Sequence, residues 1–247
     1  MTPLLIGFLC VTMVATAFLS GVFGMAGGLI LIGVLLAVLP LPAAMALHAV
    51  TQMASNGWRT LLWWRHVRWR LAAAYILGCC ATLLVWWIWR YVPDKPVALL
   101  LLGATPFMAR VLPDDLKPNA ESPVQGMIYG AICMSLLLLT GVAGPLIDSY
   151  FLGGKLARRE IVATKAACQV FGHGVKLIYF GSIIDQAASV DPTLAVLAIA
   201  ASMIGTTLSK RVLEALTDRQ YRTWAQRIIT AVAGYYLLYG GYLLLDS

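Results

Sequence analysis

The sequence predicts an all-α protein that crosses a membrane several times and is built from two inverted-topology repeats with glycine-broken helices. The first observation is composition: 60% of the 247 residues are hydrophobic, 12% are charged, and the mean hydropathy is +0.82. Such a chain has almost no water-facing surface. The second is a polar pattern that recurs 117 residues later in another apolar segment. The third is the clustering of basic residues in a few loops, which sets membrane orientation.

The first repeat is predicted to cover residues 1–112. An apolar run from Pro3 to Ser20 lacks the basic region that precedes a signal sequence, so we expect a retained helix. Residues Gly21–Gly28 read GVFGMAGG, and each glycine costs a helix interior about 1 kcal/mol. A helix break is therefore expected there, followed by a short piece from Leu29 to Leu39. The first polar pattern then falls in a helix from Ala43 to Trp64.

Two further helices are expected before the chain reaches its most polar connection. A basic loop at 65–70 precedes a helix from Leu71 to Val92, and a short span from Val97 to Leu112 follows. Residues 113–123 read PDDLKPNAESP, a composition typical of a loop. We therefore predict this segment as the connection between the two repeats.

The second repeat, residues 124–247, is expected to follow the same plan. Its motif GVAGP at Gly141–Pro145 stands 120 residues after GVFGM, and proline suits the first turn of a new helix. The expected pieces are, in order, Val124–Thr140, a half-helix at Pro145–Leu152, the second patterned helix at Glu160–Phe180, and spans at Thr193–Leu208 and Ile228–Leu245. This plan gives about 8 to 10 membrane segments.

Basic loops predict how the chain is oriented, because lysine and arginine favour the cytoplasmic side. The assignment places 65–70, 155–159 and 209–225 in the cytoplasm, and leaves 93–96, 181–192 and both termini on the periplasmic side. The turn at Pro40 then lies outside, whereas its counterpart near Lys155 lies inside. The two repeats therefore run in opposite directions through the membrane.

The patterned helices carry the candidate site. A shift of 117 residues aligns their polar members as His48 with Lys165, Gln52 with Gln169, Asn56 with His173, and Arg59 with Lys176. The spacing i, i+4, i+8, i+11 puts these members on one face of each helix, and polar groups inside a membrane usually face a cavity or a partner. We predict that the substrate-binding residues are His48, Gln52, Asn56, Lys165, Gln169 and His173. Arg59 and Lys176 lie farther along and are interpreted as interface anchors.

Helix breaks would complete an anion pocket. The predicted break residues are Gly24, Gly27, Gly28, Gly141 and Gly144. A half-helix that begins after a break directs free N–H groups and a positive dipole end at its start, which favours an anion without a metal or cofactor. A cation carrier would need buried carboxylates, and only Asp148 qualifies. Asp148 is a candidate for ion coupling, or a partner for Lys165 or for the basic loop.

Each signal also has a structural explanation. Lys165 could extend to the membrane surface, since it lies close to the start of its span. The two histidines could be satisfied core residues, and the two glutamines could bridge helices, as polar residues in membranes often do. The Gly-x-x-x-Gly spacing at Gly24–Gly28 is also typical of close helix packing. The recurrence of the whole set at matching positions favours function.

These motifs support a family resemblance. GVFGMAGG is followed by a helix with Pro42, Gln52 and Asn56, and the second Gly-x-x-Gly at Gly141–Gly144 is followed by ATKA at Ala163–Ala166. Over essentially its whole length the chain resembles the sulfite exporter TauE/SafE family, also called the toluene sulfonate uptake permease family. The resemblance implies a multi-pass carrier of the bacterial inner membrane that exports sulfur-containing anions such as sulfite, sulfoacetate or related sulfonates.

We therefore expect a secondary transporter that works by alternating access around Gln52 and Gln169, with a small anion and the lipid bilayer as its partners. A homodimer is compatible with the sequence, whereas the absence of any long basic face argues against nucleic acid. A channel or a carrier for another small anion is the alternative. An intramembrane enzyme is disfavoured, because Cys168, Asp148 and the histidines stand in no nucleophile or metalloprotease motif.

Overall fold

The computed structural model describes residues 2–23, 26–111, 121–152, 156–183 and 191–245. Within these ranges the chain forms α-helices and no strand. The helices are α1 (Pro3–Phe23), α2 (Ala26–Val38), α3 (Leu41–Leu62), α4 (Trp69–Trp89), α5 (Lys95–Val111), α6 (Pro123–Thr140), α7 (Gly144–Leu152), α8 (Arg158–Ile178), α9 (Pro192–Ala215) and α10 (Asp218–Leu245). A 3₁₀ turn at Trp64–His66 follows α3, and a π turn at Tyr179–Ile183 follows α8.

Several helices are long and apolar enough to cross a bilayer. Among the described residues, five meet both conditions: α1, α4, α6, α9 and the Gln226–Leu245 part of α10. The two patterned helices, α3 and α8, have 22 and 21 residues, but their polar faces lower their hydropathy. A polar face is acceptable inside a membrane when other helices cover it. The prediction of an all-α polytopic membrane protein is confirmed.

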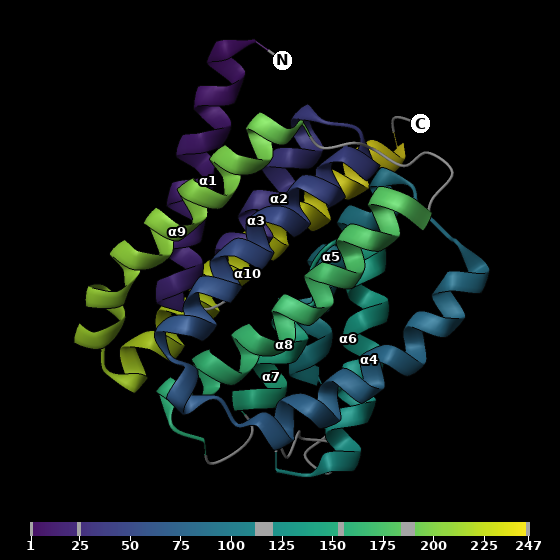
Figure 1. Ribbon diagram of the computed structural model, residues 1–247. Helices are drawn as coiled ribbons and strands as arrows, with labels where there is room; N and C mark the ends of the chain where they lie inside the picture. The colour runs from purple at the N-terminus through teal and green to yellow at the C-terminus, as the bar shows by residue number, and fades with distance from the viewer. Residues whose placement is uncertain (1, 24–25, 112–120, 153–155, 184–190, 246–247) are drawn as a thin grey trace.

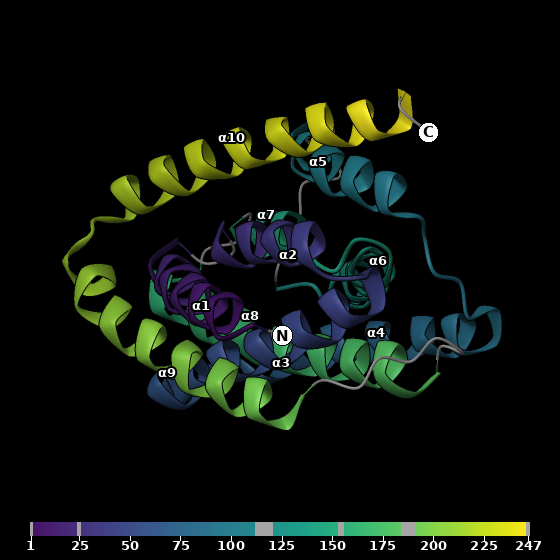
Figure 2. The ribbon, with the colours of Figure 1, turned by 90° about the horizontal axis from the view of Figure 1, so that it is seen from above.

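The helices lie in three layers when the molecule is seen from above (Figure 2). Helices α5 and α10 pack together as one outer layer, and α9, α3, α8 and α4 form the opposite one. Between them lie α1, α2, α7 and α6, with α1 packed along α9 and α6 along α4. The two short helices, α2 and α7, therefore occupy the middle of the protein and contact both outer layers.

The connection between α9 and α10 differs from the prediction. A basic loop at 209–225 was expected, but α9 continues to Ala215 and α10 begins at Asp218. The hydropathy falls at Lys210 and Arg211 because charged side chains begin there, although the backbone stays helical. Long basic side chains at a helix end can reach water without ending the helix. The predicted loop is wrong, whereas the basic character of this end of the helix is retained.

Basic segments from three parts of the sequence meet at one end of the bundle. Arg158 donates a hydrogen bond to the carbonyl of Leu216 between α9 and α10, and Arg68 forms a 3.5 Å ion pair with Glu160. Helix α1 begins and α10 ends at the opposite end (Figure 1). The charged connections and the chain termini are therefore separated by the length of the helices.

The predicted glycine breaks have distinct packing roles. Gly141 ends α6 with φ +83°, a left-handed conformation that favours glycine, and a β-carbon there would lie 2.7 Å from the sulfur of Met45. A β-carbon on Gly27 would overlap the backbone of Thr16, so this glycine lets α1 and α2 touch. Gly24 lies outside the described residues. The remaining two, Gly28 and Gly144, line the small cavity described in the next section.

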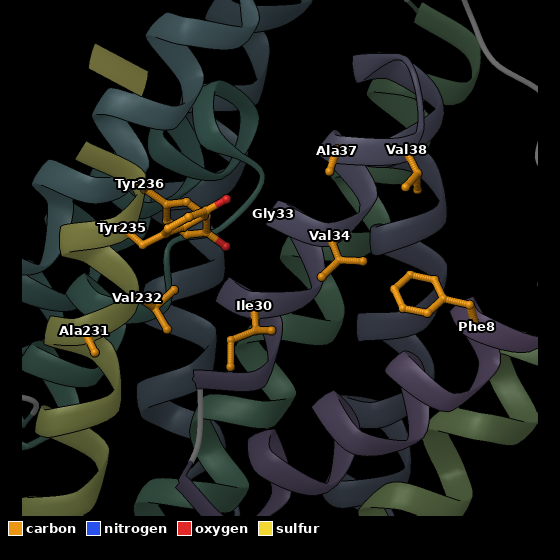
Figure 3. Close-up of a pocket in the computed structure, with 10 residues that line it drawn as sticks. All are labelled: Phe8, Ile30, Gly33, Val34, Ala37, Val38, Ala231, Val232, Tyr235 and Tyr236. Atoms are coloured by element: carbon orange, nitrogen blue, oxygen red, sulfur yellow. The ribbon is translucent and has the colours of Figure 1, made fainter. Parts of the chain in front are cut away.

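An apolar cavity of about 510 Å³ lies between α1, α2 and α10 (Figure 3). Phe8 of α1 and Val34 of α2 line one side of it, and Tyr235 and Tyr236 of α10 line the other. Tyr236 is buried and donates a hydrogen bond to the carbonyl of Leu29, in the first turn of α2. Helix α10 is thereby attached to the short helix that borders the candidate site.

Candidate anion-binding site

Helices α3 and α8 pack with their polar faces together and run antiparallel. Gly57 lies opposite Val170 and Gly174 lies opposite Met53, with 3.9 Å and 3.7 Å from the position of a glycine β-carbon to the facing side chain. A β-carbon at either glycine would be in ordinary van der Waals contact with the facing side chain, so the two helices pack against each other at these points. Because the directions are opposed, the start of one polar face meets the end of the other.

Lys176 and His48 form the first polar cluster. The Lys176 ammonium contacts Nδ1 of His48 at 2.6 Å and donates to the carbonyl of Gly141 at 2.9 Å, while Nε2 of His48 lies 2.9 Å from the carbonyl of Gly28. A carbonyl can only accept, so Nε2 carries the proton and Nδ1 accepts from the lysine. Both side chains are fully buried. We call Lys176, His48 and these two carbonyls the Lys176 cluster.

Lys165, Asp148 and Arg59 form a second cluster near the other end of the two helices. The Lys165 ammonium is fully buried and forms an ion pair with the Asp148 carboxylate of α7. Arg59 interacts electrostatically with both and donates to the side-chain oxygen of Asn56 at 3.0 Å. We call Lys165, Asp148 and Arg59 the Lys165 cluster. Of the alternatives for Lys165, pairing with Asp148 is confirmed and extension to the membrane surface is wrong.

A small cavity lies among the two glutamines, the first turn of α2 and the segment that leads into α7. Its lining comes from α2, α3, α8 and the segment that leads into α7: Gly28, Leu29, Gln52, Val142, Ala143, Gly144, Gln169 and His173. Its volume is about 10 Å³, which is close to the minimum for a single water molecule. Oε1 of Gln169 and Nδ1 of His173 are buried and have no hydrogen-bond partner in the described part of the chain. Nδ1 of His173 can donate to a ligand in one tautomer, whereas Oε1 of Gln169 can only accept.

The structure brings most of the predicted site residues together. Gln52, Gln169 and His173 line the small cavity, and the ring of His48 lies 5.4 Å from that of His173 between centroids. Asn56 does not line the small cavity, and its amide donates to the backbone carbonyl of Gln52 at 2.9 Å. Lys165 belongs to the second cluster instead.

The interpretation of Arg59 and Lys176 as interface anchors is wrong. Arg59 is 2% exposed and Lys176 is fully buried, so both belong to the polar clusters. The signal was present in the sequence, because both residues continue the i, i+4, i+8, i+11 spacing of the helix face. Their position near the helix ends is typical of interface anchors, but the spacing places them on the polar face.

The donor set suits an oxyanion. Ammonium, guanidinium and amide groups donate hydrogen bonds to oxygen, and charge-assisted bonds of this kind are the stronger ones. Within the described ranges, no group of three histidine, cysteine, aspartate or glutamate side chains is arranged to hold a metal ion. The cluster donors are therefore of the kind from which an oxyanion accepts hydrogen bonds.

Comparison with known proteins places the chain in a family. The family model described as Sulfite exporter TauE/SafE matches residues 8–236, which is most of the chain and includes both polar clusters. No curated protein and no solved structure matches it. The family is one of membrane transporters rather than enzymes. On the basis of this match and the helical membrane fold, the chain belongs to the sulfite exporter TauE/SafE family.

Proposed function

We propose that this protein is a secondary transporter that exports a small sulfur-containing anion, such as sulfite, sulfoacetate or another organosulfonate, across the bacterial inner membrane. Family membership supports transport of sulfur anions. The anion binds in the small cavity, between Gln52, Gln169 and His173, with Lys176 as its charge partner. Lys176 replaces Lys165 in this role, since Lys165 already has a carboxylate.

The observation that carries the proposal is the burial of Lys176 without an acidic partner. Its side chain is fully buried, and among the described residues no carboxylate lies within ion-pair distance of its ammonium group. An ionised group inside a membrane is expensive unless something compensates its charge. The contacts of Lys176 with the Gly141 carbonyl and with the His48 imidazole offset part of that cost. A bound anion would offset the rest.

The helix packing supports two inverted repeats, 1–112 and 124–247, joined by 113–123. The repeat relation exchanges α1 with α6, α2 with α7, α3 with α8, α4 with α9 and α5 with α10. It turns the α1–α9 contact into α6–α4, and the α2–α10 contact into α7–α5. The α3–α8 and α5–α10 contacts turn into themselves. This is the pattern expected of a twofold relation between repeats. Termini at one end and basic segments at the other support periplasmic termini.

Alternating access accounts for the size of the cavity. A cavity of about 10 Å³ is too small for an oxyanion, so the state seen here is closed around the site. Rocking of one repeat against the other would open it first to one side and then to the other. For a monoanion leaving a cell that is negative inside, the membrane potential supplies about 2.3 kcal/mol per 100 mV. Export therefore requires no coupling ion.

Counterflow in proteoliposomes tests the proposal. Vesicles with purified protein contain labelled sulfite, and sulfite, sulfonates or small carboxylates are added outside. We expect saturable exchange restricted to sulfur oxyanions, lost in Lys176→Met and kept in Lys210→Met. Lys210 is the matched control, because it lies half-exposed at the end of α9. Absence of exchange with folded wild-type protein, or normal exchange in Lys176→Met, would contradict the proposal.

The same assay separates a carrier from a channel. A channel passes anions without saturation and without acceleration by anion on the opposite side. A carrier shows saturation and also acceleration by anion on the opposite side, because its binding site returns across the membrane loaded with that anion. Exchange of carboxylates as well as sulfur anions would favour a general small-anion carrier.

A further inference from the structure

The two polar clusters are built from residues that the repeat relates to one another, but they differ in charge. The 117-residue shift relates Arg59 to Lys176 and His48 to Lys165, and the 120-residue shift of the glycine motifs relates Gly28 to Asp148. In the Lys176 cluster His48 contacts the backbone carbonyl of Gly28, and in the Lys165 cluster Lys165 contacts the side chain of Asp148. A carboxylate therefore stands in one cluster where the other has a glycine.

This carboxylate has the chemistry of the substrate. It is a small oxyanion, 5% exposed, and it accepts from the ammonium of Lys165 within the electrostatic reach of Arg59. It differs from a free anion in being attached to α7, the short helix that begins at the cavity wall with Gly144. Asp148 and Gly144 of the cavity wall thus belong to the same short helix.

We propose that Asp148 is a tethered anion that occupies a second substrate position, between Lys165 and Arg59, whenever the transported anion is absent from it. This inference rests on the proposed function. During transport the substrate displaces the carboxylate from Lys165, then passes to the Lys176 cluster, and the carboxylate returns. Lys165 consequently keeps an anionic partner at every stage, which avoids the cost of an isolated charge inside the membrane.

The exchange of one anion for another predicts a specific kinetic effect of Asp148→Asn. Without the competing carboxylate the substrate binds Lys165 more tightly, so the half-saturating sulfite concentration in counterflow falls by about tenfold, the size expected for a close buried charge. The maximal exchange rate falls as well, because nothing displaces the substrate from Lys165. A purely structural ion pair would lower the rate without lowering half-saturation. In Asp148→Asn with Lys165→Met the gain in affinity disappears.

Control variants make the comparison independent of folding. Asp191→Asn is the matched control, since Asp191 caps α9 and asparagine caps equally well. Asp148→Glu keeps a competing carboxylate, so it should not show the tenfold fall in half-saturation. In detergent, sulfite should raise the unfolding temperature of Asp148→Asn more than that of the wild type, which tests binding without reconstitution.

Two results overturn different statements. Wild-type vesicles that exchange no sulfur anion would overturn the proposed function. Wild-type vesicles that exchange sulfite, together with unchanged or raised half-saturation in Asp148→Asn and no added stabilisation by sulfite, would overturn the role of Asp148 alone.

Discussion

Lys176 and His48 meet across the two halves of the chain, with 2.6 Å between Nζ and Nδ1. The sequence alignment pairs each of them with a different residue, Lys176 with Arg59 and His48 with Lys165. The alignment matches the two helices start to start, whereas in the structure they pack antiparallel, so that the start of one lies beside the end of the other. Each cluster therefore takes one cation from the end of one polar face and its neighbour from the start of the other.

The contact predicts that His48 is needed for transport. In His48→Phe the ring no longer accepts from Lys176 or donates to Gly28, so the ammonium loses one of its two hydrogen bonds beside the cavity. We expect the rate of sulfite counterflow to fall by about tenfold or more. His66→Phe is the matched control, since His66 lies in the 3₁₀ turn away from the site. A His48→Phe variant as active as the wild type would weaken the assignment of the Lys176 cluster.

Gln169 provides an isosteric test of the sign of the substrate charge. Gln169→Glu preserves the shape of a side chain that lines the small cavity and adds a negative charge there. We expect the half-saturating anion concentration to rise by more than about tenfold, because like charges in a site of low dielectric repel. Gln220→Glu at the exposed start of α10 is the control and should transport normally. Improved transport of anions by Gln169→Glu would contradict an anion site.

The sequence predicted the helices well and the partners of the site residues less well. Helix α3 was expected at Ala43–Trp64 and spans Leu41–Leu62, because an apolar segment with a polar face has a clear period. The pairing of Lys176 with His48 depends on two helices that lie 128 positions apart in the chain. A period says which face a residue occupies, whereas the partner on another helix follows only from packing. For the same reason the sequence left open whether Lys165 was paired with Asp148.

Gly141 should be required for stability rather than for chemistry. It adopts φ +83°, and a left-handed conformation costs a residue with a β-carbon about 1–2 kcal/mol. Contact with Met45 adds to that cost in Gly141→Ala. We expect a lower unfolding temperature in detergent, measured against Gly7→Ala. A β-carbon on Gly7 meets nothing within 4 Å, so this control should be as stable as the wild type or slightly more stable. Equal stability of both variants would contradict the role of the break.

Two adjacent tyrosines of α10 offer a test of how the short helix α2 is held. Tyr236 is 2% exposed and donates to the carbonyl of Leu29, whereas Tyr235 is 59% exposed and lies beside it on the same side of the cavity (Figure 3). Tyr236→Phe removes only the hydroxyl, so we expect a loss of about 1 kcal/mol in the free energy of unfolding. Tyr235→Phe makes the same chemical change without breaking that hydrogen bond and should have no measurable effect.

The consequence of Tyr236→Phe should reach transport as well as stability. Leu29 and its neighbour Gly28 form one wall of the small cavity, and a β-carbon on Gly28 would lie 3.2 Å from Oε1 of Gln52. If the hydroxyl holds this wall in place, its loss lets the first turn of α2 move against Gln52. We therefore expect a raised half-saturating sulfite concentration in Tyr236→Phe and an unchanged one in Tyr235→Phe. A stability loss without any change in half-saturation would show that the α10 contact supports the fold but does not position the site.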